Sequence, residues 1–290
     1  MSNPATAPSP LQTYRAHRYV APLREGGSLP AVVETERGMF VAKFRGAGQG
    51  ARALVAELVV GGIAERLGLP LPELALLEMP EGFGRAEPDA EIQDILRGSR
   101  GLNVGLGYVE GAFPYDPLAA ADLVSPEAAA DVVWLDALTM NIDRTARNPN
   151  LLVAGDPPRL WLIDHGAALY VHHNWESVTP ERARAPFAPI RDHVLLPIAG
   201  DLREADARLA PRLTPEAIAE VLGAVPDALL MDAPEGRTPP FATPEANREA
   251  YAAFFRERLA APRAWAEAAA DARDAAGASG EGSGRLAYRR

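Results

Sequence analysis

The chain has no cysteine among its 290 residues. Without thiols it forms no disulfide, no thiolate metal site and no cysteine nucleophile, which excludes zinc fingers, iron–sulfur proteins and cysteine enzymes. It also has no uncharged apolar run near the roughly 18 residues that a membrane helix needs, and residues 1–13 lack the apolar core of a signal peptide. We therefore expect a cytoplasmic protein that does not associate with membranes.

A surplus of basic residues is missing as well. Asp and Glu number 39 against 29 Lys and Arg, so the formal net charge is −10. Surfaces that bind nucleic acid or anionic lipid carry the opposite sign, so direct nucleic-acid binding is not expected. The composition is otherwise that of a globular protein, with 48% hydrophobic residues and enough length for one large core or two smaller ones.

Segment composition divides the chain into four parts. Residues 1–13 are rich in Pro, Ser and Ala, and residues 276–290 are rich in Gly and polar residues, which predicts a flexible tail at each end. Between them, residues 14–112 have mainly strand patterns and residues 113–275 mainly helical ones. The predicted fold is therefore α+β, with a β-rich N-lobe that contains one main helix and a mainly helical C-lobe.

Helix starts and periodicity locate the main elements. Apolar residues recur at helical spacing from Gly50 to Leu67, and Gly68 follows as a C-cap. Ser125, Thr214 and Thr243 each precede Pro-Glu, a pattern typical of helix starts. Further helices are predicted at 88–97 and 262–275, and strands at 18–22, 31–33, 39–44, 74–79, 102–109, 151–153 and 160–163.

The most informative residues follow the helix that starts at Ser125. Asp143 precedes Asn148 by five positions, a strand pattern comes next, and a second strand pattern ends in Asp164-His165-Gly166. Carboxylate and amide oxygens at the ends of two short strands are hard ligands of the kind that Mg²⁺ prefers. We therefore predict that Asn148 and Asp164 bind Mg²⁺ and that Asp143 is a general base.

Phosphoryl transfer also needs positive charge and backbone amides against the phosphates. Lys43, on the strand Phe40–Phe44, is the candidate phosphate contact, and the turn Gly26-Gly27-Ser28 is the candidate phosphate-binding loop. Glu57 lies 14 residues after Lys43 on the predicted helix and is expected to hold it by an ion pair. Each residue alone has an ordinary structural explanation, but their joint order favours an ATP-dependent phosphotransferase.

The order of these motifs resembles that of the protein-kinase-like fold. More closely, residues 18–200 resemble compact members of the HipA-like kinase family of bacteria. The segments that carry the resemblance are Gly26-Gly27-Ser28 with Pro30, Lys43-Phe44, Arg52-Ala53-Leu54 with Glu57, Leu67-Gly68-Leu69-Pro70, Gly101-Leu102-Asn103, Asp143-Arg144-Thr145 and Asn148-Pro149-Asn150. Two positions depart from common kinases: Asn141-Ile142 replaces His-Arg, and His165 replaces the Phe of Asp-Phe-Gly.

The resemblance implies ATP and Mg²⁺ as cofactors and a Ser or Thr hydroxyl of an unidentified protein as the acceptor. We place the adenine-binding hinge at Tyr108, Val109 and Glu110. The toxins of the family have an additional N-terminal portion, whereas the Gly-rich turn here comes at residue 26, so an antitoxin-like partner is possible but not favoured. Two alternatives stay open: the same site transfers AMP or phosphorylates a small molecule or lipid headgroup, or the protein is a pseudokinase that serves as a nucleotide-binding interaction module.

Four further residues have structural interpretations. Asp136 is expected to hydrogen-bond the backbone of the catalytic loop, and Arg144 either neutralises a phosphate or braces that loop. His172 and His173 are interpreted as surface or loop residues, because adjacent side chains of a strand point to opposite faces and cannot reach one metal ion.

Overall fold

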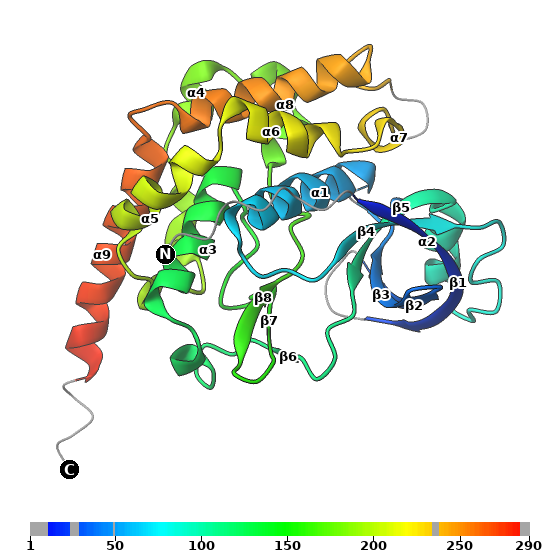
Figure 1. The fold of residues 1–290 in the computed structure, drawn as a ribbon, viewed down its shortest axis with the longest axis horizontal. Helices are drawn as coiled ribbons and strands as arrows, with labels where there is room; N and C mark the ends of the chain where they lie inside the picture. The colour runs from blue at the N-terminus through cyan, green and yellow to red at the C-terminus, as the bar shows by residue number, and fades with distance from the viewer. Residues whose placement is uncertain (1–10, 24–28, 49, 234–237, 285–290) are drawn as a thin grey trace.

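The computed structural model describes residues 11–23, 29–48, 50–233 and 238–284. Its first lobe is a closed barrel of five strands, at the right of Figure 1. The strands follow around the barrel in the order β1 (Gln12–Pro22), β2 (Ala31–Thr35), β3 (Gly38–Lys43), β5 (Gly101–Gly107) and β4 (Leu74–Met79). Neighbouring strands are antiparallel except β1 and β4, whose parallel pairing closes the barrel.

Side chains of the barrel strands alternate between two cores. On β4, Ala75 and Leu77 belong to the core inside the barrel, whereas Leu74 and Leu76 belong to a larger core outside it. Successive side chains of a strand point to opposite faces, so one strand contributes to both cores. Helix α2 (Ala90–Gly98) adds Ile92 to the barrel core.

Helix α1 (Gly50–Leu67) crosses the middle of the molecule between the barrel and the helical lobe (Figure 1). Two adjacent glycines allow close packing on both of its sides. A Cβ at Gly61 would lie 2.9 Å from Leu74 Cδ2, and a Cβ at Gly62 would lie 2.9 Å from Val221 Cγ1. Glycine inside a helix is about 1 kcal/mol less favourable than alanine. The close packing of α1 against β4 and the C-lobe therefore offsets a loss of helix stability at these two positions.

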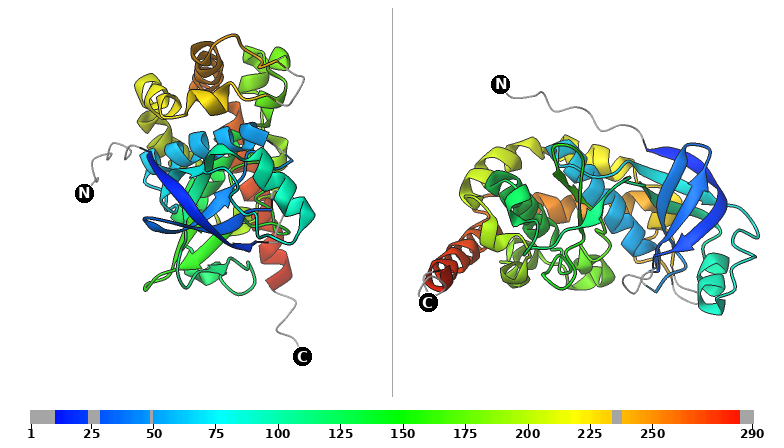
Figure 2. Two further views of the ribbon diagram at one scale, coloured as in Figure 1. Left: turned by 90° about the vertical axis from the view of Figure 1, so that its right-hand side faces the viewer. Right: turned by 90° about the horizontal axis from the view of Figure 1, so that it is seen from below.

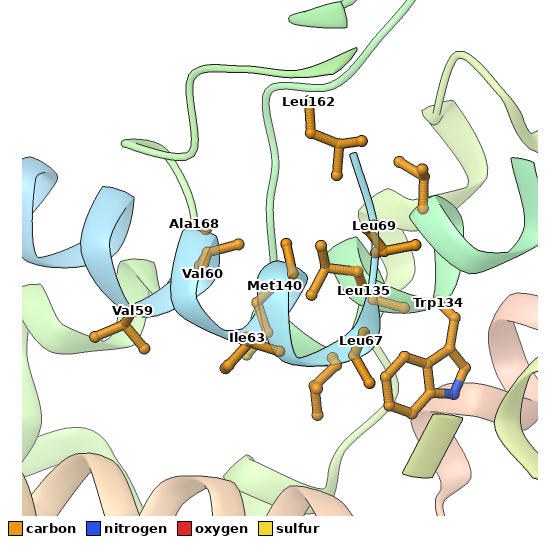
Figure 3. Packing of buried hydrophobic residues seen from close by; sticks show 14 of the residues in the cluster. Val59, Val60, Ile63, Leu67, Leu69, Trp134, Leu135, Met140, Leu162 and Ala168 are labelled. Carbon is orange, nitrogen blue, oxygen red and sulfur yellow. The ribbon is translucent and has the colours of Figure 1, made fainter. Parts of the chain in front are cut away.

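The larger core forms where α1 meets the C-lobe. Val60 and Ile63 of α1 share this core with Leu135 of α3 (Pro126–Thr139) and with Leu162 at the end of β8 (Arg159–Leu162), all labelled in Figure 3. This core contains residues from both sides of the predicted lobe boundary between residues 112 and 113. By its packing, α1 therefore belongs to both lobes, and the domain limits stay a prediction.

The C-lobe combines helices with one small sheet, in which β7 (Leu151–Ala154) pairs with β6 (Phe113–Pro114) and β8. Its remaining α-helices are α4 (Pro180–Arg184), α5 (Leu202–Leu209), α6 (Pro215–Gly223), α7 (Asp227–Leu230), α8 (Pro244–Leu259) and α9 (Ala264–Gly284). The 3₁₀-helices are η1 (Ala121–Leu123), η2 (Tyr170–His173), η3 (Trp175–Ser177), η4 (Ala188–Asp192), η5 (Leu196–Ile198) and η6 (Ala210–Arg212). Figure 2 shows α9 at the end of the C-lobe far from the barrel. No helix in the described part of the chain is both long and apolar enough to cross a membrane.

The predicted α+β arrangement of a β-rich N-lobe and a helical C-lobe is confirmed. The bounds of α1 and β4 are those that the sequence predicted. Ser125, Thr214 and Thr243 each cap a helix, because their hydroxyl oxygens accept hydrogen bonds from the backbone N–H three residues later.

Three predictions about local structure are wrong. Gln12 and Thr13 are part of β1 rather than of an N-terminal tail, and α9 continues to Gly284, into the predicted C-terminal tail. His172 lies on η2 and is fully buried, with its Nδ1 2.8 Å from the hydroxyl of Tyr251, so it is not a surface residue. Its neighbour His173 is exposed, as expected.

Two leucines with opposite environments test the importance of the larger core. Leu135 is 0% exposed and Leu118 is 96% exposed. We expect Leu135→Ala to lower the free energy of unfolding by about 2–5 kcal/mol, because the substitution leaves a cavity, and Leu118→Ala to change it by less than about 0.5 kcal/mol. Urea denaturation measures both values, and equal losses for the two variants would contradict the packing described here.

Candidate active site

The loop that the sequence predicts to be catalytic, residues 141–150, follows the end of α3, where Met140 has a left-handed backbone with φ of 56°. Three side-chain amides converge on Asp143. Asn141 Oδ1 accepts a hydrogen bond from the backbone N–H of Asp143 at 3.1 Å, and Asn148 Nδ2 donates to Asp143 Oδ2 at 2.8 Å. Asn150 Nδ2 donates to the carbonyl and to Oδ2 of Asp143, each at 3.3 Å. The Asp143 carboxylate is therefore fixed by the two asparagines that the loop places after it.

Lys43 and Asp164 form the central ion pair of the site. Lys43 Nζ lies 2.6 Å from Asp164 Oδ2, and the Lys43 side chain is almost fully buried. Burial by itself would raise the pKa of Asp164, but the charge and hydrogen bond of Lys43 outweigh it and lower that pKa below its ordinary value. The Asp164 carboxylate is therefore charged at neutral pH.

Glu57 does not have the predicted partner. Among the residues that the structure describes, Lys43 pairs with Asp164 and not with Glu57. Glu57 is 1% exposed, and its Oε2 accepts a hydrogen bond from the backbone N–H of His165 at 2.8 Å. Burial raises the pKa of Glu57 to about 7, opposed by the nearby charge of Lys43. The prediction that Glu57 holds Lys43 by an ion pair is therefore wrong. Glu57 instead joins α1 to the segment that carries Asp164.

Arg144 is fully buried and connects the loop to that same segment. Its Nη1 donates to the carbonyl of Asn150 and, at 3.3 Å, to the carbonyl of Ile163. Its Nη2 lies 3.2 Å from His165 Nδ1. Because a guanidinium has only donors, Nδ1 is an acceptor and the proton of the neutral ring is on Nε2. Of the two roles that the sequence left open, Arg144 braces the loop.

Asp136 on α3 is the counter-ion of Arg144. Its Oδ2 accepts from Arg144 Nε at 2.5 Å and from His193 Nε2 at 2.9 Å, and its Oδ1 accepts from Asn141 Nδ2 at 3.1 Å. His193 Nδ1 accepts from the backbone N–H of Leu195, which assigns the donating proton to Nε2. The Asp136 carboxylate thus binds side chains, whereas we expected it to bind backbone.

Burial controls the charge states of this network. It would raise the pKa of Asp136, but the charge of Arg144 and the hydrogen bond from His193 hold that pKa well below its usual range. Burial lowers the pKa of His193, and burial together with the charge of Arg144 lowers the pKa of His165 to about 3. The network therefore holds one ion pair and two neutral imidazoles at neutral pH.

A cavity of about 250 Å³ lies beside these residues. One part of its lining is apolar, with Val41, Leu106, Leu152 and Ile163 among its residues. The polar part consists of Lys43, Asn148, Asn150 and Asp164. An apolar wall suits a flat aromatic base, and the polar end suits charged groups. A larger groove of about 510 Å³ in the C-lobe, around Trp175 and Phe254, contains none of the predicted site residues.

The predicted cofactor-binding residues are only partly at this cavity. Tyr108 and Val109 line it, whereas Glu110 is exposed and lies outside the lining. The turn Gly26-Gly27-Ser28 lies outside the described residues. The role of these positions in nucleotide binding stays a prediction.

The donor atoms at the polar end fit Mg²⁺. Asn148 uses its amide nitrogen for Asp143, so its amide oxygen is the atom left to bind a cation, next to the carboxylate of Asp164 in the same lining. Within residues 11–23, 29–48, 50–233 and 238–284, no group of three or more His, Cys, Asp or Glu forms a metal site. Mg²⁺ in nucleotide enzymes needs no such cage, because phosphates and water complete its shell.

Sequence patterns missed two residues of the site. Asn150 binds Asp143 and lines the cavity, and the repeat of asparagine in Asn148-Pro149-Asn150 was the available signal. His193 reaches Asp136 across 57 positions of sequence, and no local pattern indicates such a contact.

The fold and this site define a two-lobed α+β protein with a lysine, an aspartate and an asparagine at one cleft. Residues 21–184, more than half of the chain, match the family model of the HipA-like kinases. The chain therefore belongs to the HipA-like kinase family, as its motifs suggested, and membership implies an ATP-using phosphotransferase.

No curated protein has a sequence that matches this chain. Among solved structures, the crystal structure of the Helicobacter pylori proinflammatory kinase CtkA is similar, with 14% sequence identity and a TM-score of 0.48. The match covers 85% of this chain and 94% of that chain. This likeness is distant.

The charge state of Asp136 predicts a pH dependence of stability. Because the folded-state pKa of Asp136 lies well below its ordinary value of 3.8, its carboxylate contributes fully to stability at neutral pH, and this contribution is lost progressively as the pH falls below that ordinary value toward the folded-state pKa. We expect Asp136→Asn to cost about 3–5 kcal/mol of unfolding free energy at neutral pH, because it leaves Arg144 buried without its counter-ion. The difference in unfolding free energy between Asp136→Asn and the wild type should therefore narrow mainly below about pH 4 and continue to narrow as the pH falls further.

Urea midpoints measured across that pH range give the gap. Asp122, an exposed aspartate, is the control, and Asp122→Asn should leave the midpoint unchanged at each pH. A gap between Asp136→Asn and the wild type that stays constant as the pH falls would show that Asp136 is not the low-pKa group.

Proposed function

We propose that the protein is an ATP- and Mg²⁺-dependent kinase that transfers the γ-phosphoryl group to a Ser or Thr hydroxyl of a protein. The observation that carries the proposal is the arrangement at one cavity, where an apolar wall ends at Lys43, Asn148 and Asp164, with Asp143 bound directly behind Asn148. Family membership supports ATP as the donor. The Ser/Thr acceptor rests on the resemblance to HipA-like kinases.

The nucleotide occupies the cavity in one orientation. Its base packs against Val41 and Leu152 in the apolar part, next to Tyr108. Its phosphates then point to Lys43, whose ammonium neutralises their charge. Asp164 and the amide oxygen of Asn148 would hold Mg²⁺, which would supply positive charge against the charge that develops on the phosphates.

The acceptor approaches from the side of Asp143. The hydrogen bonds recorded to its carboxylate reach Oδ2, so Oδ1 is the oxygen that accepts the proton of the attacking hydroxyl. The hydroxyl oxygen forms a bond to the γ-phosphorus while the bond between that phosphorus and the β-phosphate oxygen breaks. ADP leaves with the electron pair, and the proton remains on Asp143 until solvent removes it.

The role of Asp143 is tested by Asp143→Asn. We expect the turnover of ATP to fall by about 10²–10⁴, because the amide has no carboxylate oxygen to take the proton. Nucleotide affinity should be unchanged, because Asp143 is not part of the cavity lining. Transfer from γ-labelled ATP measures the rate, calorimetry measures the affinity, and Asp122→Asn is the control. A folded variant that transfers phosphate at the wild-type rate would refute the role of Asp143.

Metal-dependent nucleotide binding is tested at Asp164. We expect the wild type to bind ATP more tightly with Mg²⁺ than without it, and Asp164→Ala to lose this difference, because the variant retains only one of the two metal ligands. Calorimetric titration of both proteins, with and without Mg²⁺, gives four dissociation constants. If Mg²⁺ has the same effect on both proteins, the metal assignment fails.

The transferred group and the acceptor are tested by intact mass. Incubation with ATP and candidate acceptors yields an added phosphoryl group under our proposal and an added adenylyl group if the site transfers AMP. Wild-type protein that binds ATP with Mg²⁺ but modifies no protein acceptor and turns over no ATP would instead be a nucleotide-binding module.

A further inference from the structure

Two residues of the site hold left-handed backbone conformations that are uncommon for side chains other than glycine. Asn150 has φ of 49° and Asp164 has φ of 55°. Asn and Asp tolerate this region better than other residues do, but the conformation persists only where the surroundings enforce it. Asp164 is also the residue that presents a carboxylate to the nucleotide cavity.

The neighbours of Asp164 are anchored on both sides. The backbone N–H of Ile163 donates to the carbonyl of Asn150 at 3.2 Å, and the carbonyl of Ile163 accepts from Arg144 at 3.3 Å. On the other side, the N–H of His165 donates to Glu57, and its ring accepts from Arg144 at 3.2 Å. The contacts of residues 163 and 165 hold the backbone on both sides of Asp164, and the Asp164 side chain makes its ion pair with Lys43.

Among these contacts, those of Arg144 reach both sides of Asp164: the carbonyl of Ile163 and the ring of His165. The same guanidinium also binds the carbonyl of Asn150, so it supports both left-handed residues. Asp136 and His193 hold the guanidinium in turn. The fork of an arginine gives the planar, fixed set of donors that such a junction requires.

We propose that Arg144 and His165 are positioning residues: through the hydrogen bond between Nη2 and Nδ1 they hold Asp164 in the conformation that binds Mg²⁺ with the nucleotide. This inference rests on the proposed function. The side chain at position 165 acts through its acceptor atom, so a polar substitute that keeps an acceptor at the place of Nδ1 preserves the function. An apolar substitute of similar size does not.

The experiment uses His165 because a substitution of Arg144 leaves the buried carboxylate of Asp136 without its cationic partner, which destabilises the fold whether or not Asp164 is affected. His165→Leu removes the acceptor, and His165→Asn keeps one, because the amide oxygen of asparagine occupies the place of Nδ1. His172→Leu is the matched control: His172 is a second buried histidine that accepts or donates one hydrogen bond at Nδ1, to Tyr251, outside the site.

For each variant, calorimetry with a non-hydrolysable ATP analogue gives the dissociation constant with and without Mg²⁺. We expect His165→Leu to weaken binding in the presence of Mg²⁺ by about 10- to 100-fold, the range for residues that orient a metal ligand. Binding without Mg²⁺ should be unchanged. His165→Asn should be close to the wild type, and His172→Leu should lower the melting temperature without affecting either constant.

A second measurement needs no nucleotide. Amide hydrogen exchange across residues 163–168 of the free protein should be faster in His165→Leu than in the wild type and His165→Asn, because the segment loses one of its anchors. In His172→Leu, exchange in this segment should stay at the wild-type rate.

Other outcomes overturn the inference. If His165→Leu folds and binds the analogue with Mg²⁺ as tightly as the wild type, or loses affinity equally with and without Mg²⁺, His165 does not position a metal ligand. If His165→Asn is as weak as His165→Leu, the acceptor atom is not what matters. A wild type without any Mg²⁺ dependence would instead remove the proposed function itself, and the positioning role with it.

Discussion

Burying a guanidinium with a carboxylate is favourable only when the remaining donors and acceptors of both groups are also satisfied. Arg144 and Asp136 meet this condition through five other groups: the carbonyls of Asn150 and Ile163, the rings of His165 and His193, and the amide of Asn141. These groups belong to separate segments of the chain. Satisfying one buried ion pair therefore brings together the end of α3, the catalytic loop, the end of β8 and the segment after it.

Helix α1 adds the barrel to this assembly. Its glycines bring it against β4 on one side and against the C-lobe on the other, and Glu57 reaches from it to the backbone of His165. Glu57 is buried with its Oε1 lacking a hydrogen-bond partner among the described atoms, which is why burial dominates its pKa. The contact between Glu57 and His165 therefore joins α1, which packs against the barrel, to the segment that carries Asp164.

Much of the fold follows from patterns that are local in sequence. The apolar periodicity of α1, the caps at Ser125 and Thr243, and the two strands that follow the loop all depend on residues within a few positions of one another. The same is true of Asp143 and Asn148, whose spacing places both on one short loop. Such features could be predicted because neighbouring residues alone determine them.

The remaining features depend on tertiary contacts. Three examples involve residues that are distant in sequence. Strand β1 pairs with β4, buried His172 contacts Tyr251, and Glu57 binds the backbone of His165. A helical glutamate near a strand lysine has the same local pattern whether it binds the lysine or a backbone amide. Only the packing of α1 decides between the two, and that packing also involves β4 and the C-lobe.

The alternation of side chains along β3 explains how one cavity can hold both apolar and charged groups. Phe40 and Ala42 point into the barrel, so Val41 and Lys43 point to the opposite face and line the cavity two residues apart. The apolar wall and the cationic end are therefore neighbouring positions on one strand. Asp143 lies beyond that end, behind Asn148 and outside the cavity lining, so in the proposed function the acceptor hydroxyl approaches from a side that the nucleotide does not occupy.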